Sequence, residues 1–403
     1  MKRNFSRFFF GASCFLPLFA SAQSQPITTL NGQEVRVVST AVPFLNFTPD
    51  ARSAALGEAG VALRDADANA IYWNPSKLVY AQRDAGGSIS YTPWLRELIG
   101  DMYYTNLSAY KKVSKNDVIG VSLLYFDLGT IDFTTANGVA AGSFNSREYA
   151  FTASYSRRLF TNFSMGVNLK YLNSNLAAGA PNGNGSALQP GATGAADISA
   201  FYQNQTRDNV TGRGLGWAFG GMISNIGGKI NYGGQERYFI PTNLRLGTSV
   251  TYFADQYSKF NFLVDFNKLM VPTPPETEIV NGQTQIVRGK DPNRPYLSAM
   301  FGSFADAPGG FGEELKEVAI ATGVEYWYND MFAARVGYFN ESTDKGGRKY
   351  ATAGLGIRLQ QRYGIDFSYL IPVRSNSPLA QTFRVSLLLN LEKGAQRVAE
   401  DDE

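Results

Sequence analysis

The strongest constraint on the fold is a strict two-residue alternation between Glu317 and Glu392, where five consecutive segments alternate apolar residues with small or polar ones. Successive side chains of a β-strand point to opposite faces of a sheet, so each segment is predicted to be a strand. One face is continuously apolar. The charged residues inside the strands fall on the other face, with both signs present: Glu325, Arg335, Arg358, Asp366 and Arg384.

Alternation by itself fits either a soluble sandwich or a transmembrane barrel. The segments run about ten residues, which is enough to cross a bilayer when the strands are tilted. Tyr and Phe stand at the segment ends, as in the aromatic girdles of membrane barrels, and Gly and Ala are frequent on the polar face. We therefore favour an all-β fold, an antiparallel transmembrane barrel with paired charges inside its lumen.

Nine further strands are predicted upstream, which brings the total to about fourteen. The connections between them alternate between short and long, as expected for tight periplasmic turns and larger external loops. An even number of strands places both ends of the barrel on the periplasmic side. The nine strands are predicted near residues 86–94, 101–113, 117–132, 144–158, 162–173, 196–204, 213–225, 242–253 and 259–270.

The N-terminus reads as a secretory signal peptide, residues 1–22, in which basic residues precede an apolar stretch and the small residues Ala20-Ser21-Ala22. This signal would direct export of the chain, and we expect its cleavage after Ala22. An exported membrane protein built from strands is expected in the outer membrane of a Gram-negative cell. We divide the rest into an N-terminal segment or plug (23–85), the barrel (86–392) and a charged C-terminal tail (393–403).

The composition excludes most chemistry. The chain has no His, and its one Cys, Cys14, lies in the signal peptide, so His and Cys nucleophiles and metal ligands are missing from the exported chain. We expect no enzyme activity and no cofactor. The signal peptide holds three of the 37 basic residues and no acid, which leaves 34 basic against 34 acidic residues. This balance gives no reason to expect nucleic-acid binding.

Two motifs carry a family resemblance. The pattern ARSAALGEAGVAL (51–63) followed by ANAIYWNPSKL (68–78) resembles the N-terminal region of FadL-like outer-membrane proteins. The stretch PYLSAMFGSF (295–304) and the residues after it, up to Lys316, resemble the PorV branch of that superfamily, which serves the type IX secretion system of Bacteroidota.

The resemblance implies a role in protein transport. A protein of this branch would take secreted cargo with a C-terminal signal domain from the translocon barrel and deliver it to the sortase-containing attachment complex. Its surroundings would be outer-membrane lipid. The alternative within the superfamily is a FadL-type transporter of hydrophobic compounds. The charged residues predicted in the lumen argue against this alternative, because they do not suit an apolar conduit. A structural porin is the third possibility, and apolar residues in the long loops count against it.

The long loop over residues 271–314 is the candidate partner-binding site, through Phe301, Phe304 and Phe311. Apolar residues in such a loop need burial, either by folding back into the barrel mouth or by contact with a partner protein. The sequence leaves these alternatives open.

Three smaller features of the sequence carry predictions about the N-terminal segment and the membrane interface. We interpret Trp73, Asn74 and Pro75 as a turn that seats the N-terminal segment in the barrel. We predict a short Asp-capped helix over 65–70. Trp94 and Trp327 are predicted to be anchors at the membrane interface.

Overall fold

The computed structural model describes residues 27–28, 34–96, 99–134, 140–176, 189–234, 236–281, 283–360, 362–374 and 377–391. The predicted signal peptide (1–22) and charged tail (393–403) lie outside these residues. No helix in the described part of the chain has both the length and the apolar character needed to cross a bilayer.

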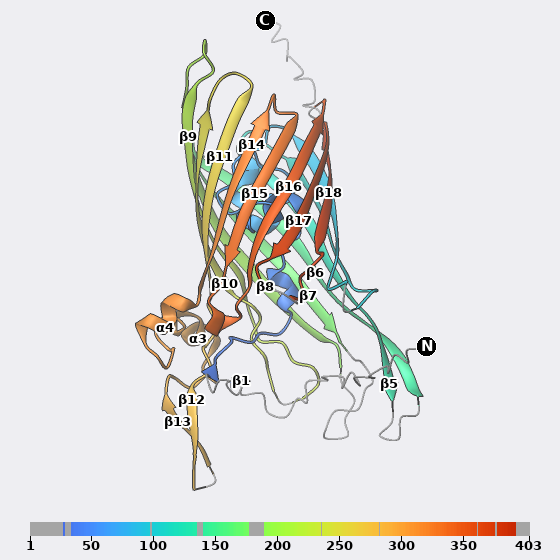
Figure 1. The fold of residues 1–403 in the computed structure, drawn as a ribbon, viewed down its shortest axis with the longest axis vertical. Coiled ribbons are helices and arrows are strands. Elements are labelled where there is room, and N and C mark those ends of the chain that lie inside the picture. Colours follow the sequence, from blue (N-terminus) through green and yellow to red (C-terminus); the bar gives the residue numbers. More distant parts are fainter. Residues whose placement is uncertain are drawn as a thin grey trace, which may run out of the picture.

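Fourteen antiparallel strands close into a single barrel (Figure 1), which confirms the predicted fold class. Each strand pairs with the next barrel strand along the chain, and β18 closes the barrel on β3 with Leu391 opposite Ala85. The strands are β3 (Ala85–Pro93), β4 (Tyr103–Lys112), β5 (Asp117–Thr134), β6 (Ala140–Phe160), β7 (Phe163–Asn175), β8 (Gly191–Arg207), β9 (Gly214–Gly227), β10 (Asn243–Phe253), β11 (Ser258–Leu269), β14 (Val318–Tyr328), β15 (Phe332–Asn340), β16 (Lys349–Leu359), β17 (Tyr363–Pro372) and β18 (Phe383–Leu391).

Several strands extend beyond their predicted ends. β5 reaches Thr134, β6 begins at Ala140, and β8 begins at Gly191 rather than near 196. A strand of 21 residues such as β6 exceeds the length needed to cross a bilayer, so its end continues into water. Neither face has to be apolar there, and the alternation that marks a strand in the sequence fades.

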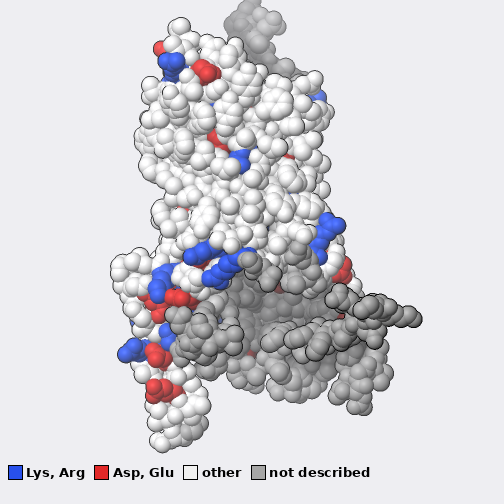
Figure 2. All heavy atoms as spheres, viewed as in Figure 1, with Lys and Arg blue, Asp and Glu red and all other residues white. Residues whose placement is uncertain are grey.

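The predicted facing of the strands is confirmed. Leu169, on the apolar face, is 67% exposed on the outside of the barrel, whereas Glu325, on the polar face, is 0% exposed in the lumen. Figure 2 shows few charged side chains on the visible wall and a concentration of them at one end. The outer surface is thus apolar, as a wall in contact with lipid must be.

The two ends of the barrel differ. At one end, here the turn end, six tight connections join the strands, and at the other, the loop end, all connections except that between β5 and β6 are longer (Figure 1). The connection between β11 and β14 is the most elaborate. It holds a hairpin that the sequence did not predict, β12 (Glu276–Val280) with β13 (Gln283–Arg288), and two helices, α3 (Tyr296–Gly302) and α4 (Phe311–Lys316).

Residues 36–84, here the plug, run through the lumen from the loop end to the turn end (Figure 1). At the loop end, Ala41 N donates to Phe239 O at 2.9 Å. At the turn end, the Lys259 ammonium lies 2.9 Å from an Asp65 oxygen. The short elements β1 (Ile27–Thr28) and β2 (Glu34–Val35) precede the plug, which contains η1 (Pro43–Asn46), α1 (Ala51–Ala54), α2 (Ala70–Trp73) and η2 (Pro75–Tyr80).

The Asp-capped helix of the plug is not where the sequence predicted it. Asp50 caps α1, because its Oδ2 accepts the Ser53 N–H at 2.8 Å. The prediction of a helix over 65–70 is wrong: residues 65–69 form a bend and a turn, in which Asp67 Oδ1 accepts the Asn69 N–H at 2.8 Å, and α2 begins only at Ala70. The same Asx chemistry serves turns as well as helix caps, and the sequence pattern does not separate them.

Small residues on the lumen face let the plug backbone approach the wall. A Cβ added to Gly337 would lie 2.1 Å from Gly57 N, and one added to Gly323 would lie 2.7 Å from Leu56 Cβ. No larger side chain fits at these positions unless the plug moves. The run of small residues in the plug and the glycines of the wall are therefore complementary.

The plug and the wall share an apolar core inside the barrel, which includes Phe44, Trp73 and Phe126. Trp94 belongs to it, 9% exposed, with its ring stacked on Phe47 at 4.1 Å between centroids. Trp327 is 5% exposed and faces the lumen, since it lies two residues after Glu325 on the same face of β14. The prediction that Trp94 and Trp327 anchor the membrane interface is therefore wrong.

Replacing Leu169 by Arg tests the assignment of the outer face. Leu169 lies at the middle of β7, so the charge would sit near the bilayer midplane and lower the free energy of unfolding by about 2–4 kcal/mol. Reversible urea unfolding in lipid vesicles measures this change. The control is Val210→Arg in the exposed turn between β8 and β9, for which we expect less than about 0.5 kcal/mol. Equal effects of the two variants would contradict the facing.

Candidate functional site: lumen charge network and loop platform

Four of the predicted lumen charges meet in one network on neighbouring strands. Glu325 and Arg335 are opposite each other in the ladder of β14 and β15, and Arg335 Nε donates to Glu325 Oε2 at 2.7 Å. Arg335 Nη1 also donates to Asp366 Oδ1 at 2.8 Å. Arg358 Nη2 donates to Asp366 Oδ2 at 2.7 Å. The two carboxylates therefore alternate with the two guanidinium groups along the wall.

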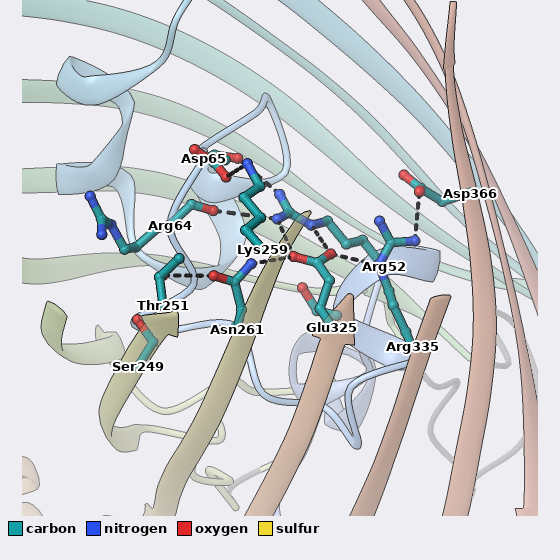
Figure 3. A network of polar contacts seen from close by, with 12 residues as sticks. Arg52, Arg64, Asp65, Ser249, Thr251, Lys259, Asn261, Glu325, Arg335 and Asp366 are labelled. Atoms are coloured by element: carbon teal, nitrogen blue, oxygen red, sulfur yellow. Dashed lines mark hydrogen bonds and ion pairs between the residues drawn. The ribbon is translucent and has the colours of Figure 1, made fainter. Parts of the chain in front are cut away.

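The plug completes this network with Arg52 of α1 (Figure 3). Arg52 Nε donates to Glu325 Oε2 at 2.9 Å and Nη2 donates to Oε1 at 2.8 Å, while Nη1 donates to Asp65 O at 2.9 Å. The Trp327 ring lies 5.8 Å from the Arg52 guanidinium and 5.3 Å from that of Arg335, within cation–π range. The sequence did not predict Arg52, because its partner carboxylate lies 273 residues away.

Arg384 stands apart from these four charges. Its Nε donates to the Thr48 carbonyl of the plug at 3.2 Å. On the same strand, Ser386 Oγ accepts the Ala51 N–H at 2.8 Å. β18 thus binds plug backbone and not the carboxylate network.

Trp73, Asn74 and Pro75 form the junction of α2 and η2 and contact both plug and wall. Trp73 Nε1 donates to Asp50 Oδ1 at 2.6 Å. Asn74 Nδ2 donates to the carbonyls of Val61 in the plug and of Ala200 in the wall, at 3.2 and 3.0 Å. The Pro75 carbonyl accepts Ser156 Oγ from the wall at 2.6 Å.

Wall side chains also satisfy the backbone of the plug elsewhere. Asp265 Oδ2 accepts the N–H groups of Gly60 and Val61 at 2.7 and 2.8 Å, and Thr352 Oγ1 donates to Ala55 O at 2.9 Å. Buried polar groups are costly unless they are paired, so these bonds bind the plug to the wall as a structural part. The plug therefore runs the length of the lumen as part of the barrel (Figure 1).

The second candidate site is the connection of residues 270–317, here the loop platform. Phe301, Phe304 and Phe311 are exposed by 63%, 42% and 76%, although they belong to the short helices α3 and α4 or the link between them. In α3 the described side chains that are buried are Ala299 and Met300. The three phenylalanines therefore do not fill the barrel mouth, which the plug occupies.

Buried ion pairs that the sequence did not predict hold the platform on the barrel. Lys268, at the end of β11, lies 2.9 Å from a Glu314 oxygen and 2.6 Å from a Glu317 oxygen. Lys345 of η3 (Thr343–Lys345) lies 2.9 Å from Glu317 and 2.6 Å from Glu313. These pairs tie α4 to the end of β11 and to the connection between β15 and β16.

Hydrogen bonds fix the rest of the platform. Tyr296 OH is 2.8 Å from Thr242 Oγ1 and accepts the Gly227 N–H at 3.1 Å, which attaches the start of α3 to the β9–β10 connection. Arg294 Nη2 donates to Asp306 Oδ2 at 2.6 Å. The helices are thus held from several sides while the phenylalanines stay in solvent.

Replacing Glu325 by Gln tests the lumen network. The variant leaves Arg52 and Arg335 facing a neutral amide, and loss of one partner of a buried ion pair costs about 3–5 kcal/mol of unfolding free energy. Urea unfolding in vesicles measures it. Asp344→Asn is the matched control, since its pair with Lys316 (2.7 Å) is exposed and we expect little change. A wild-type stability for Glu325→Gln would contradict the structural role of the network.

The Glu313 carboxylate makes the platform sensitive to acid. Burial raises its pKa, but hydrogen bonds from the Lys345 ammonium and the Gly309 N–H, with the nearby charge of Arg36, outweigh burial and leave the pKa below the ordinary glutamate value. Its stabilising contribution is present above the ordinary pKa and lost as the pH falls through the lowered one.

Amide hydrogen exchange of residues 303–316, corrected for the intrinsic effect of pH, measures this loss. We expect protection to be constant from pH 7 to 5 and to fall below the ordinary glutamate pKa. A Glu313→Gln variant should have weaker protection at pH 7 and a smaller acid-dependent loss. If the Glu313→Gln variant lost as much protection in acid as the wild type, the loss of protection would have to come from another titrating group.

The chain is similar to solved channel structures and to one protein family. Among solved structures, the chain is similar to the TodX deltaS2S3 mutant monoaromatic hydrocarbon channel (TM-score 0.48, 11% identity, 85% of this chain and 99% of that one). It is also similar to the Pseudomonas putida toluene transporter TodX (0.44, 10%, 88% and 98%) and a Pseudomonas aeruginosa FadL homologue (0.42, 12%, 88% and 99%). No curated protein matches in sequence.

The family model "Type IX secretion system protein PorV" matches residues 30–276, more than half of the chain. That span covers the plug and the strands β3 to β11. The chain therefore belongs to the PorV family of type IX secretion system proteins.

Proposed function

We propose that the protein, exported by a cleaved signal peptide, works in the outer membrane as a carrier for secreted proteins. It binds cargo with a C-terminal signal domain at the translocon barrel and delivers that cargo to the sortase-containing attachment complex. Membership of the PorV family supports a role in type IX secretion. The apolar outer wall supports contact with outer-membrane lipid.

The observation that carries this proposal is the exposure of Phe301, Phe304 and Phe311 on a platform fixed by buried ion pairs. Large apolar side chains on helices held from several sides form a surface that is already ordered before a partner arrives. Such a surface loses little conformational entropy on binding, and aromatic residues, Phe among them, are enriched at protein interfaces. Leu297 and Leu315, both more than half exposed, extend it.

The β12–β13 hairpin offers a second kind of contact. Its register places Thr277 opposite Ile286 and Ile279 opposite Thr284, so one face is wholly β-branched. Ile279 is 79% exposed. A two-stranded hairpin is marginally stable alone, and a β-branched face with free edges suits pairing with a β-structured partner. We place cargo or translocon contacts on this hairpin and on α3 and α4.

The plug favours a carrier over a FadL-type transporter of hydrophobic compounds. A transporter needs a route through or out of the lumen, whereas Arg52 and Glu325 form a bidentate buried pair across it. Asp265 and Asn74 add further bonds between plug and wall. Opening a route would break these bonds in a low-dielectric interior, so the loop end is the better candidate for function.

A double variant, Phe301→Asp with Phe311→Asp, tests the platform. Both side chains are more than 60% exposed, so the barrel should assemble normally. Charges in the centre of an apolar interface should reduce binding at least about ten-fold. The measurement is affinity purification of tagged protein from outer membranes, with quantitative mass spectrometry of type IX components and of proteins carrying the C-terminal signal domain.

The control is Val210→Asp, an equally exposed apolar position at the turn end. It should leave recovery of these proteins unchanged. Undiminished recovery by the double variant, with a normally folded barrel, would remove the platform from the interface. Stoichiometric recovery of a hydrophobic small molecule in place of protein partners would favour the transporter.

A further inference from the structure

The lumen has a cavity of about 450 Å³ at the loop end, between the plug and the strands β10, β11, β14 and β15. Its apolar lining includes Phe47 and Trp73 from the plug and Phe339 and Ala319 from the wall. A space of this size holds a drug-sized small molecule. It is distinct from the exposed phenylalanines of the platform.

Arg245 of β10 lines the cavity and is 4% exposed. Its guanidinium lies 4.8 Å from the Tyr72 ring and 5.2 Å from the Trp73 ring, and its Nη2 donates to Tyr72 OH at 3.0 Å. Its Nη1 has no hydrogen-bond partner within the described chain. These aromatic contacts hold the cation in place. The buried Asp265 carboxylate of β11 interacts with it electrostatically, but no ion-pair contact joins the two groups among the described residues.

The other charges around the cavity are mostly neutralised within the protein. Glu317 lies 2.9 Å from Lys345, and Glu341 accepts from Arg348 at 3.0 Å. Glu58 also lines the cavity.

Asn243, two residues before Arg245 on the same face of β10, is 6% exposed, and its Oδ1 has no partner among the described residues. The cavity therefore presents a buried donor cation beside acceptors, Asn243 Oδ1 and Glu58. A buried guanidinium with no carboxylate in ion-pair contact is costly, and an unpaired buried amide oxygen adds to that cost. A ligand that supplies an anion and a hydrogen-bond donor removes both costs.

We propose that this cavity binds a small amphipathic carboxylate that also carries an N–H or O–H group and an aromatic or aliphatic body. The carboxylate binds Arg245, the donor faces Asn243 Oδ1 or Glu58, and the body packs on Phe47, Trp73 and Phe339. N-acylated amino acids have this combination of groups. The proposal does not rest on the secretion role and holds for any function of the barrel.

Isothermal titration of the full-length protein in non-ionic detergent tests it, with N-acetyl-phenylalanine as probe and N-acetyl-phenylalaninamide as its neutral match. We expect saturable binding of the acid and at least about ten-fold weaker binding of the amide, because only the acid pairs with Arg245. Arg245→Gln should lower the affinity for the acid to that measured for the amide.

Ala319→Phe places a large side chain in the cavity and should abolish binding of both compounds. This variant tests the site even if Arg245→Gln fails to fold. Arg158→Gln is the control: this arginine donates to Val79 O in the plug at 2.9 Å but does not line the cavity, and binding should be unchanged. Three results would each overturn the site: no saturable binding of the acid, equal affinity for acid and amide, or wild-type affinity in Ala319→Phe.

Discussion

The structure depends on how a closed barrel satisfies a polar inner wall. Each barrel strand is hydrogen-bonded to two neighbouring strands, so the strand backbone has its hydrogen-bond partners. The inward side chains, however, include buried charges such as Glu325, Asp265 and Arg335. The plug supplies partners for these charges from inside the barrel. Arg52 binds Glu325, and the backbone of Gly60 binds Asp265. Plug and wall therefore form one polar structure, and neither is satisfied without the other.

This constraint moves the candidate function to the loop end. Opening the lumen would break buried ion pairs between plug and wall, whereas the platform already presents apolar side chains to solvent. The same chemistry serves both places: Lys268 and Lys345 bind the carboxylates of α4 beneath the exposed Phe311 much as Arg52 binds Glu325 in the lumen. A surface held in this way is preorganised for a partner, and its exposed aromatic residues supply contact area.

The strands and their two faces could be predicted because a two-residue period is a local signal. Strand length and the aromatic residues at strand ends then predict lipid outside, which puts Leu169 on the outer face and Glu325 in the lumen. Contacts across the lumen could not, since the partner of Arg52 lies 273 residues away and no local pattern marks it. Trp327 shares a face with Glu325, so its register predicts the lumen, whereas the general preference of Trp for membrane interfaces predicts the wrong place. The β12–β13 hairpin was missed because a strand pair in water needs no apolar alternation.

Site-specific photocrosslinking at Phe301 tests the central claim, that the platform is the binding surface, most directly. A photoreactive phenylalanine analogue at this position keeps the shape and exposure of the side chain, and the same analogue at Val210 reports on the turn end. In intact cells we predict crosslinks from position 301 to type IX secretion proteins or to cargo carrying the C-terminal signal domain, and none of these from position 210. Crosslinks to lipid alone from position 301, or the same protein partners from both positions, would contradict the claim.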